Sequence, residues 1–152
     1  MFRRFISLML MLLVLSAFLV ACGDDNSPLP SYTGATSVTN PDATKSIVDA
    51  FKGSNKDAKV TSFTTSDGPD KVKSFFTDNF KKNGWDDKSG DKTIADTSSQ
   101  LSGLAQGVFL QAFEKGNHKA IIVAFPGSSA SLFGYQNVAD TGTAYMVVDA
   151  NT

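Results

Sequence analysis

The chain has 152 residues, with 14 basic and 15 acidic side chains, one cysteine and a net charge of −1 at pH 7. This nearly balanced charge argues against a nucleic-acid binder, because such a protein needs a basic face to neutralise phosphates. A single cysteine cannot form a disulfide within the chain, so the hydrophobic core must hold the fold together.

The first 22 residues follow the pattern of a secretory signal, with a basic start, an apolar core and a small residue before a cleavage site. Arg3 and Arg4 provide the basic start, residues 5–20 are apolar except for two serines, and Ala21 stands before Cys22. The apolar run is at the short limit for a transmembrane helix, which needs about 20 residues. An uncleaved membrane-spanning helix with an incidental cysteine is therefore the weaker alternative.

The segment Leu19-Val20-Ala21-Cys22 resembles the lipobox of bacterial lipoproteins, which reads Leu, a small or aliphatic residue, Ala or Gly, and then Cys. The resemblance implies cleavage between Ala21 and Cys22 by the lipoprotein signal peptidase. It also implies a diacylglycerol on the Cys22 sulfur, and an acyl chain such as palmitate on the new N-terminus. Two or more acyl chains hold a protein firmly on a membrane. The implied location is the extracytoplasmic face of a bacterial membrane, either the cell membrane or the outer membrane.

We therefore divide the chain into a signal peptide at 1–21, a lipidated cysteine with a flexible tether at 22–31, and a globular domain at 32–152. The tether is polar, contains prolines and shows no periodicity. Loss of the two arginines with the signal leaves 12 lysines against 15 acids, a net charge of −3. Such a domain is not basic enough to bind anionic lipid through its charge, so the lipid on Cys22 must anchor it.

The first half of the domain predicts two helices and one strand. Residues 40–53 begin with Asn-Pro-Asp, which is typical of a helix start, and continue with apolar residues at helical spacing. Residues 59–65 are rich in β-branched and aromatic side chains, which favours a strand. A longer helix is predicted at 69–82, and its single apolar face consists of Val72, Phe75, Phe76 and Phe80.

The second half predicts strands and turns. A hairpin turn at 89–91 is expected between short strands at 85–88 and 92–96, and a loop or one helical turn at 97–107. Strong strand patterns follow at 108–113 and 119–125, and the last strand is expected at 143–149. The stretch between them, residues 126–142, is predicted to be a long loop.

These elements predict an α+β fold, a single small domain in which one long and one short helix pack on an antiparallel sheet of about five strands. Residues 119–125 are apolar on both faces, because Ile121, Val123 and Phe125 alternate with small or aliphatic neighbours. A sheet with one face in water would show polar alternation. Both faces are therefore expected to be covered, and incomplete cover would leave an apolar groove.

A second resemblance covers about residues 32–150. Thr64-Thr65-Ser66-Asp67, a helix with Val72, Phe75 and Phe76, the segment Asn83-Gly84-Trp85 and the later segment 113–117 resemble a module of small, uncharacterised exported bacterial lipoproteins. This resemblance implies a fold and no defined activity.

No catalytic constellation is visible in the sequence. His118 is the single histidine, so a Ser–His–Asp triad would have to use it, with Ser128 or Ser129 as the nucleophile. Neither serine lies in a Gly-x-Ser-x-Gly elbow. We therefore interpret His118 as an exposed residue next to a turn, and a hydrolase as a remote hypothesis.

Three acids, Asp86, Asp87 and Asp91, crowd one predicted turn and could suggest calcium. Their spacing lacks the Gly and Glu that an EF-hand loop needs, so a solvated acidic hairpin is the preferred interpretation. Zinc would need more ligands than one histidine and a cysteine assigned to lipid. No metal and no cofactor is predicted.

The candidate binding loop carries Leu132, Phe133 and Tyr135. Apolar side chains in a long Gly/Ser-rich loop either fold back over the sheet or face a partner. The sequence therefore favours a non-enzymatic binding or interaction module of the cell envelope, with an envelope protein as its partner. The alternative is a carrier of a small apolar ligand, held in a groove between the 69–82 helix and the sheet near Trp85.

Overall fold

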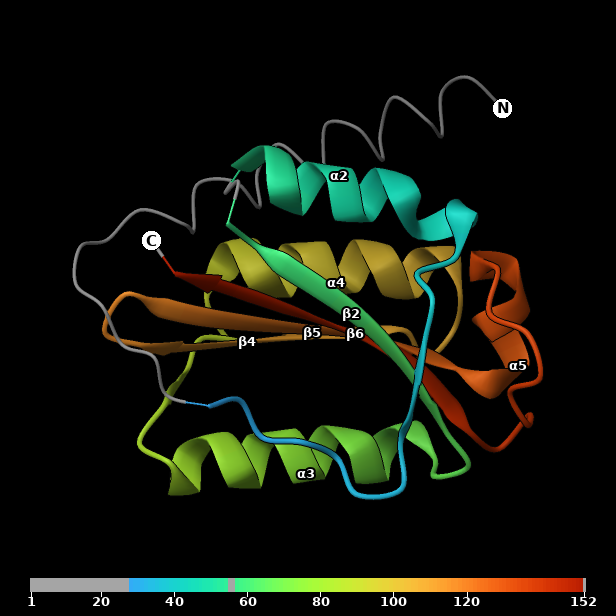
Figure 1. Ribbon diagram of the computed structural model, residues 1–152, viewed down its shortest axis with the longest axis horizontal. Coiled ribbons are helices and arrows are strands. Elements are labelled where there is room, and N and C mark those ends of the chain that lie inside the picture. Colours follow the sequence, from blue (N-terminus) through green and yellow to red (C-terminus); the bar gives the residue numbers. More distant parts are fainter. Residues whose placement is uncertain (1–27, 55–56, 152) are drawn as a thin grey trace.

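The computed structural model describes residues 28–54 and 57–151, so the predictions made for Ala21 and Cys22 lie outside the described residues. Its centre is a six-stranded antiparallel sheet with the strand order β1-β2-β6-β5-β4-β3. Helix α3 covers one face of this sheet, and helices α2 and α4 cover the other face (Figure 1). The predicted α+β class with a single antiparallel sheet is confirmed, with six strands instead of about five.

The strands are β1 (Thr36–Val38), β2 (Lys59–Thr65), β3 (Asp86–Asp87), β4 (Phe109–Lys115), β5 (His118–Pro126) and β6 (Thr143–Asn151). The α-helices are α2 (Lys45–Ser54), α3 (Pro69–Lys82), α4 (Lys92–Leu104) and the short α5 (Gly127–Ala130). Two 3₁₀ turns, η2 (Asp42–Thr44) and η3 (Ser131–Phe133), precede α2 and follow α5. Among the described residues, no helix is long and apolar enough to cross a membrane.

The alternation along β5 divides the core into two clusters, as the sequence predicts. All nine residues of β5 are buried. Ile121, Val123 and Phe125 belong to the cluster on the α2 and α4 side, while Ala120, Ile122 and Ala124 belong to the cluster on the α3 side. Both faces of the sheet are therefore covered, which explains why neither face of this strand is polar.

Helix α3 packs its predicted apolar face on the sheet through stacked rings. Val72, Phe76 and Phe80 are almost completely buried. The ring of Phe80 stacks on Phe113 with the ring centroids 4.1 Å apart, and it meets Trp85 edge-on at 5.0 Å. These side chains fill the space between α3 and the sheet in which the alternative hypothesis of a ligand carrier placed its groove.

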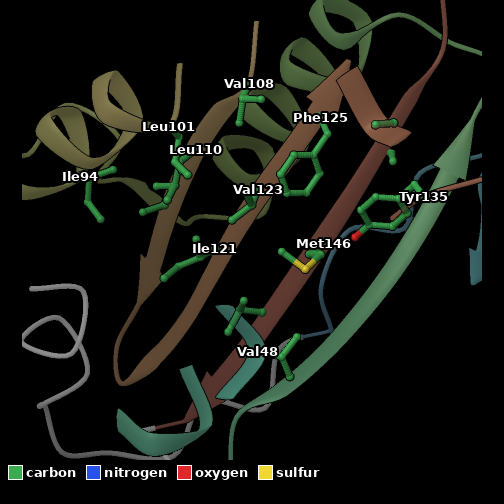
Figure 2. Packing of buried hydrophobic residues seen from close by; sticks show 14 of the residues in the cluster. Val48, Ile94, Leu101, Val108, Leu110, Ile121, Val123, Phe125, Tyr135 and Met146 are labelled. Carbon is green, nitrogen blue, oxygen red and sulfur yellow. The ribbon is translucent and has the colours of Figure 1, made fainter. Parts of the chain in front are cut away.

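Helix α4 corrects the largest error of the sequence interpretation. Residues 92–96 are not a strand, and residues 97–104 are more than the loop or single helical turn that was predicted, because Lys92–Leu104 is one helix of 13 residues. Ile94, Thr97 and Leu101 are its buried residues and repeat at helical spacing. Figure 2 shows Ile94 and Leu101 among the side chains of the cluster that also contains Val48 of α2.

Two serines of α4, a helix whose composition favoured a loop in the sequence, bind the backbone of β4 and of the residue just before it. The Ser98 hydroxyl accepts a hydrogen bond from the Leu110 N–H at 3.3 Å, and the Ser102 hydroxyl donates to the Val108 carbonyl at 2.7 Å. Strand β3 pairs only with Phe113 and Glu114, so these hydroxyls serve backbone groups beyond its reach. The Ser/Thr-rich composition of α4 thus protects a sheet edge.

Candidate functional site

The predicted binding loop is not a simple loop. It begins with α5 and η3 and then returns to the start of β6, at one end of the sheet (Figure 1). Tyr135 is only 3% exposed, and Phe133 is half-buried with its ring 4.3 Å from that of Phe125. Leu132, in contrast, is 71% exposed. Two of the three predicted residues therefore fold back over the sheet, and one faces solvent.

A hollow of about 370 Å³ opens beside Tyr135, within the size range of small-molecule sites. Its walls are residues 38–42, which connect β1 to η2, Thr64 on β2, and residues 134–136. These three segments are far apart in the sequence and meet because β1 pairs with β2 and the 134–136 segment packs against η2. The candidate site is therefore at this corner of the domain.

A chain of buried and partly buried hydrogen bonds connects the walls of the hollow. The Ser62 hydroxyl donates to Asn40 Oδ1 at 2.6 Å, and it therefore accepts from the Tyr135 hydroxyl at 2.9 Å. Asn40 Nδ2 in turn donates to the Val60 carbonyl at 3.1 Å. One network thus connects the 38–42 segment, strand β2 and the 134–136 segment, and it holds them in one arrangement.

The Tyr135 hydroxyl is neutral in this network at physiological pH. Burial raises the pKa of Tyr135 to about 12, although the hydrogen bond with Ser62 opposes this effect. The phenol therefore acts as a hydrogen-bond donor with an apolar ring. Figure 2 shows that ring on the same side of the sheet as Phe125 and Met146.

Gly134 allows the loop to approach η2 closely. Its φ of +82° lies in the left-handed region, which favours glycine. A Cβ atom on Gly134 would lie 2.8 Å from Pro41 Cβ and 3.3 Å from Ala43 Cβ. Gly134 therefore lets the 134–136 segment lie close to Pro41 and Ala43, and a larger residue at this position would push these two walls of the hollow apart.

The structure keeps the residues of the hypothetical triad apart. His118 begins the nine-residue strand β5, whereas Ser128 and Ser129 follow its end, so the length of the strand separates them by roughly 30 Å. The Ser129 hydroxyl instead donates to the Pro126 carbonyl at 3.2 Å. The geometry that a hydrolase using His118 would need is not assembled.

His118 is also not the exposed turn residue that the sequence suggested. It is 4% exposed, its Nε2 lies 2.6 Å from Asp149 Oδ1, and its ring centroid is 4.7 Å from that of Trp85. The interpretation was wrong because the covering residues come from β6 and from the segment after α3. His118 therefore belongs to the core on the α3 side.

The three crowded acids do not share a hairpin turn. Asp86 and Asp87 form β3, where Asp87 Oδ1 accepts a hydrogen bond from the Ser89 N–H at 2.9 Å, and Asp91 precedes α4. Within residues 28–54 and 57–151, no group of three His, Cys, Asp or Glu side chains is placed to hold a metal ion.

Sequence reasoning singled out Tyr135 but missed Asn40, Asp42 and Ser62 as parts of a site. Asn40 and Asp42 were interpreted only as signals of a helix start. Ser62 is a fully buried hydroxyl on a strand, and such a residue needs a polar partner. That requirement was the available signal, although the partner could not be identified from one sequence.

The described fold is thus a covered antiparallel sheet with a small hollow at one corner, whose wall combines apolar and polar residues. A family model described as START domain-like matches residues 37–130, which is more than half of the chain, and the protein belongs to this family. START-like domains are generally ligand-binding modules. No curated protein and no solved structure is detectably similar to the chain. The matched residues include two walls of the hollow, 38–42 and Thr64.

Proposed function

We propose that this protein is a lipid-anchored binding module of the bacterial cell envelope that holds a small, largely apolar ligand without converting it. The observation that carries the proposal is the hollow of about 370 Å³ whose walls are connected by the Asn40–Ser62–Tyr135 hydrogen bonds. Preformed hollows with a few fixed polar groups are typical of small-molecule sites. Membership of the START domain-like family supports the same class of function.

The hollow supports binding better than catalysis. Its wall offers a neutral phenol whose proton is already donated to Ser62, and the pKa of that phenol is raised to about 12. A general base or acid works best with a pKa near the operating pH. Tyr135 therefore suits a role in shaping the site and not in proton transfer.

The lipobox Leu19-Val20-Ala21-Cys22 supports the membrane anchor. Residues that follow soon after this motif already pack against the folded domain. Leu29 packs against the core on the α3 side, and the buried Tyr32 donates its hydroxyl proton to Asp67 Oδ2 at 2.8 Å. Lipid on Cys22 would therefore hold the domain close to the bilayer. Metabolic labelling with palmitate tests this step, because the label should be lost in Cys22→Ser.

Blocking the hollow tests the binding function. Thr64→Trp places a large ring in the hollow, whereas Thr61→Trp places the same ring on an exposed position of the same strand. We expect small apolar ligands that co-purify with the protein from envelope extracts, detected by native mass spectrometry, to be lost only in Thr64→Trp. Equal ligand retention in both variants would contradict binding in the hollow.

A second candidate function is contact with an envelope protein, and the exposed Leu132 favours it. A large apolar side chain that is 71% exposed can serve as an anchor for a partner. Photo-crosslinking in cells from position 132, with position 76 as a buried control, tests this candidate. A discrete protein adduct at position 132 alone would support it, and lipid or no adduct would count against it.

A further inference from the structure

We infer that the hollow selects a ligand with a cationic, hydrogen-bond-donating head, such as a primary ammonium on an apolar body, and that it disfavours carboxylates and phosphates. This inference rests on the proposed function, because it describes the ligand of the same hollow. The charge of the wall carries it, and the lone pairs that the hydrogen bonds of the wall leave on Asn40 and Tyr135 are consistent with it.

The charge of the wall is negative. Of the described residues that line the hollow, Asp42 is the only charged one, and the other polar residues of the wall are neutral. An anionic head would meet this carboxylate without a lysine, arginine or histidine of the wall to compensate it. A cationic head would instead gain an attractive interaction. The net charge of −3 predicted for the chain without its signal acts in the same direction over longer distances.

The hydrogen bonds of the wall leave acceptors for a ligand. The Ser62 proton is donated to Asn40, the Tyr135 proton is donated to Ser62, and Asn40 Nδ2 donates to the Val60 carbonyl. The oxygens of Asn40 and Tyr135 retain lone pairs, because each can accept more than one hydrogen bond. An ammonium group only donates, so it can use these oxygens together with the Asp42 carboxylate. A carboxylate only accepts, so it would depend on the hydroxyl and amide donors of Thr39, Thr64 and Gln136 and would also face Asp42.

The apolar parts of the wall fit the body of such a ligand. Val38, Pro41 and the ring of Tyr135 line the hollow together with the polar groups. A volume of about 370 Å³ is suitable for a compact body of roughly ten to fifteen non-hydrogen atoms. The predicted occupant is therefore a small amine with an aliphatic or aromatic body.

Three probes with the same ten-carbon skeleton test this inference, namely 4-phenylbutylamine, 4-phenylbutanol and 4-phenylbutanoate. They are titrated into the lipid-modified protein in nanodiscs, with the Val38 methyl groups followed by NMR and empty nanodiscs as the blank. The amine should bind about threefold to fivefold more tightly than the alcohol, as expected for one partly solvated charge pair. The acid should bind more weakly than the alcohol. Added salt should reduce the difference in affinity between amine and alcohol and the difference between alcohol and acid.

Asp42→Asn should remove the preference for the amine over the alcohol. Asp49→Asn is the matched control, because it makes the same charge change at an exposed position of α2 that does not line the hollow. It should keep the preference. Equal affinities for all three probes, or tightest binding of the acid, would overturn this inference and leave the proposed function standing. Absence of binding by every probe, with no difference between wild type and Thr64→Trp, would overturn both.

Discussion

The two faces of the sheet are covered by different kinds of side chain, although hydrogen bonds also join helix and sheet on the α3 side, where Gln111 Nε2 donates to Thr77 Oγ1. On the α3 side the cover consists largely of aromatic rings, with Phe76, Phe80 and Trp85 packed against Phe113 and Tyr145. On the α2 and α4 side the core is mainly aliphatic, and hydroxyl groups supply bonds between elements. The ring-packed face has its interior filled by side chains, whereas the hydroxyl-linked face borders the hollow.

This difference indicates why binding belongs to one corner of the domain. Stacked rings gain stability from close contact, so an opening between them would cost dispersion and burial energy. Directional hydrogen bonds can hold segments together around an opening, as the Asn40–Ser62–Tyr135 network does. We therefore expect changes to the rings on the α3 side to alter stability without altering the wall of the hollow.

The largest effect is expected from removing a ring on the α3 side. Phe80→Ala leaves a cavity at a fully buried position, and we expect the free energy of unfolding to fall by about 3–5 kcal/mol. Urea denaturation measures this change. Leu104→Ala, at a position that is 49% exposed on α4, is the control and should change stability by less than about 0.5 kcal/mol. A loss below about 1 kcal/mol for Phe80→Ala would show that the rings are not tightly packed.

A smaller effect is expected from breaking the network at the hollow. Tyr135→Phe keeps the ring and removes one buried hydrogen bond, so we expect a loss of about 1 kcal/mol at pH 7. The aromatic contact with Phe125 should remain, and the fold should be unchanged.

The same variant should change the alkaline stability profile. Burial raises the pKa of Tyr135 to about 12, above its value of about 10 in an unfolded chain. The folded state then retains a proton that the unfolded state has lost. The stabilisation from this difference is complete below about pH 10 and disappears as the pH rises through about 12. The midpoint temperature of thermal unfolding should fall less steeply between pH 9 and pH 12 in Tyr135→Phe than in the wild-type protein. Identical slopes in the two proteins would contradict the raised pKa of Tyr135.

The strands and the long helix could be predicted because their local patterns agree with their packing. The β2 bounds, Lys59–Thr65, and the α3 bounds, Pro69–Lys82, match the predicted ranges. In α3 a Pro at the first helical position and an apolar face at helical spacing indicate the same helix. The alternation in β5 predicted two covered faces for the same reason, since every second side chain enters each core cluster.

The features that could not be predicted from the sequence depend on contacts between distant segments. Helix α4 was missed because its serines and threonines resemble a loop, and their role appears only once β4 lies beside them. The hollow combines residues 38–42 with residues 134–136, nearly a hundred positions later, and no local pattern links them. His118 was interpreted as exposed because Trp85 and Asp149, which cover it, are also distant in sequence.

The serines of α4 offer a more local test of the hydroxyl-linked face. Ser98→Ala removes the acceptor of the Leu110 N–H, so we expect a loss of up to about 1 kcal/mol and faster hydrogen exchange at the Leu110 amide, by roughly fivefold. Ser99→Ala makes the same change at an exposed position of the same helix, and Leu110 exchange should be unaffected. Equal exchange rates in both variants would mean that Ser98 does not protect this edge.

The smallest effect is expected at Leu132, the exposed member of the predicted binding loop. Leu132→Ser removes an apolar side chain that is 71% exposed, so the free energy of unfolding should change by less than about 0.5 kcal/mol. Affinity for 4-phenylbutylamine should also be unchanged, because Leu132 does not line the hollow. Phe133→Ser, by contrast, removes the ring that packs on Phe125 and should destabilise the domain measurably. If Leu132→Ser instead weakened amine binding severalfold, the η3 turn would have to take part in the site. The conclusion that Leu132 faces solvent while the 134–136 segment faces the ligand would then be wrong.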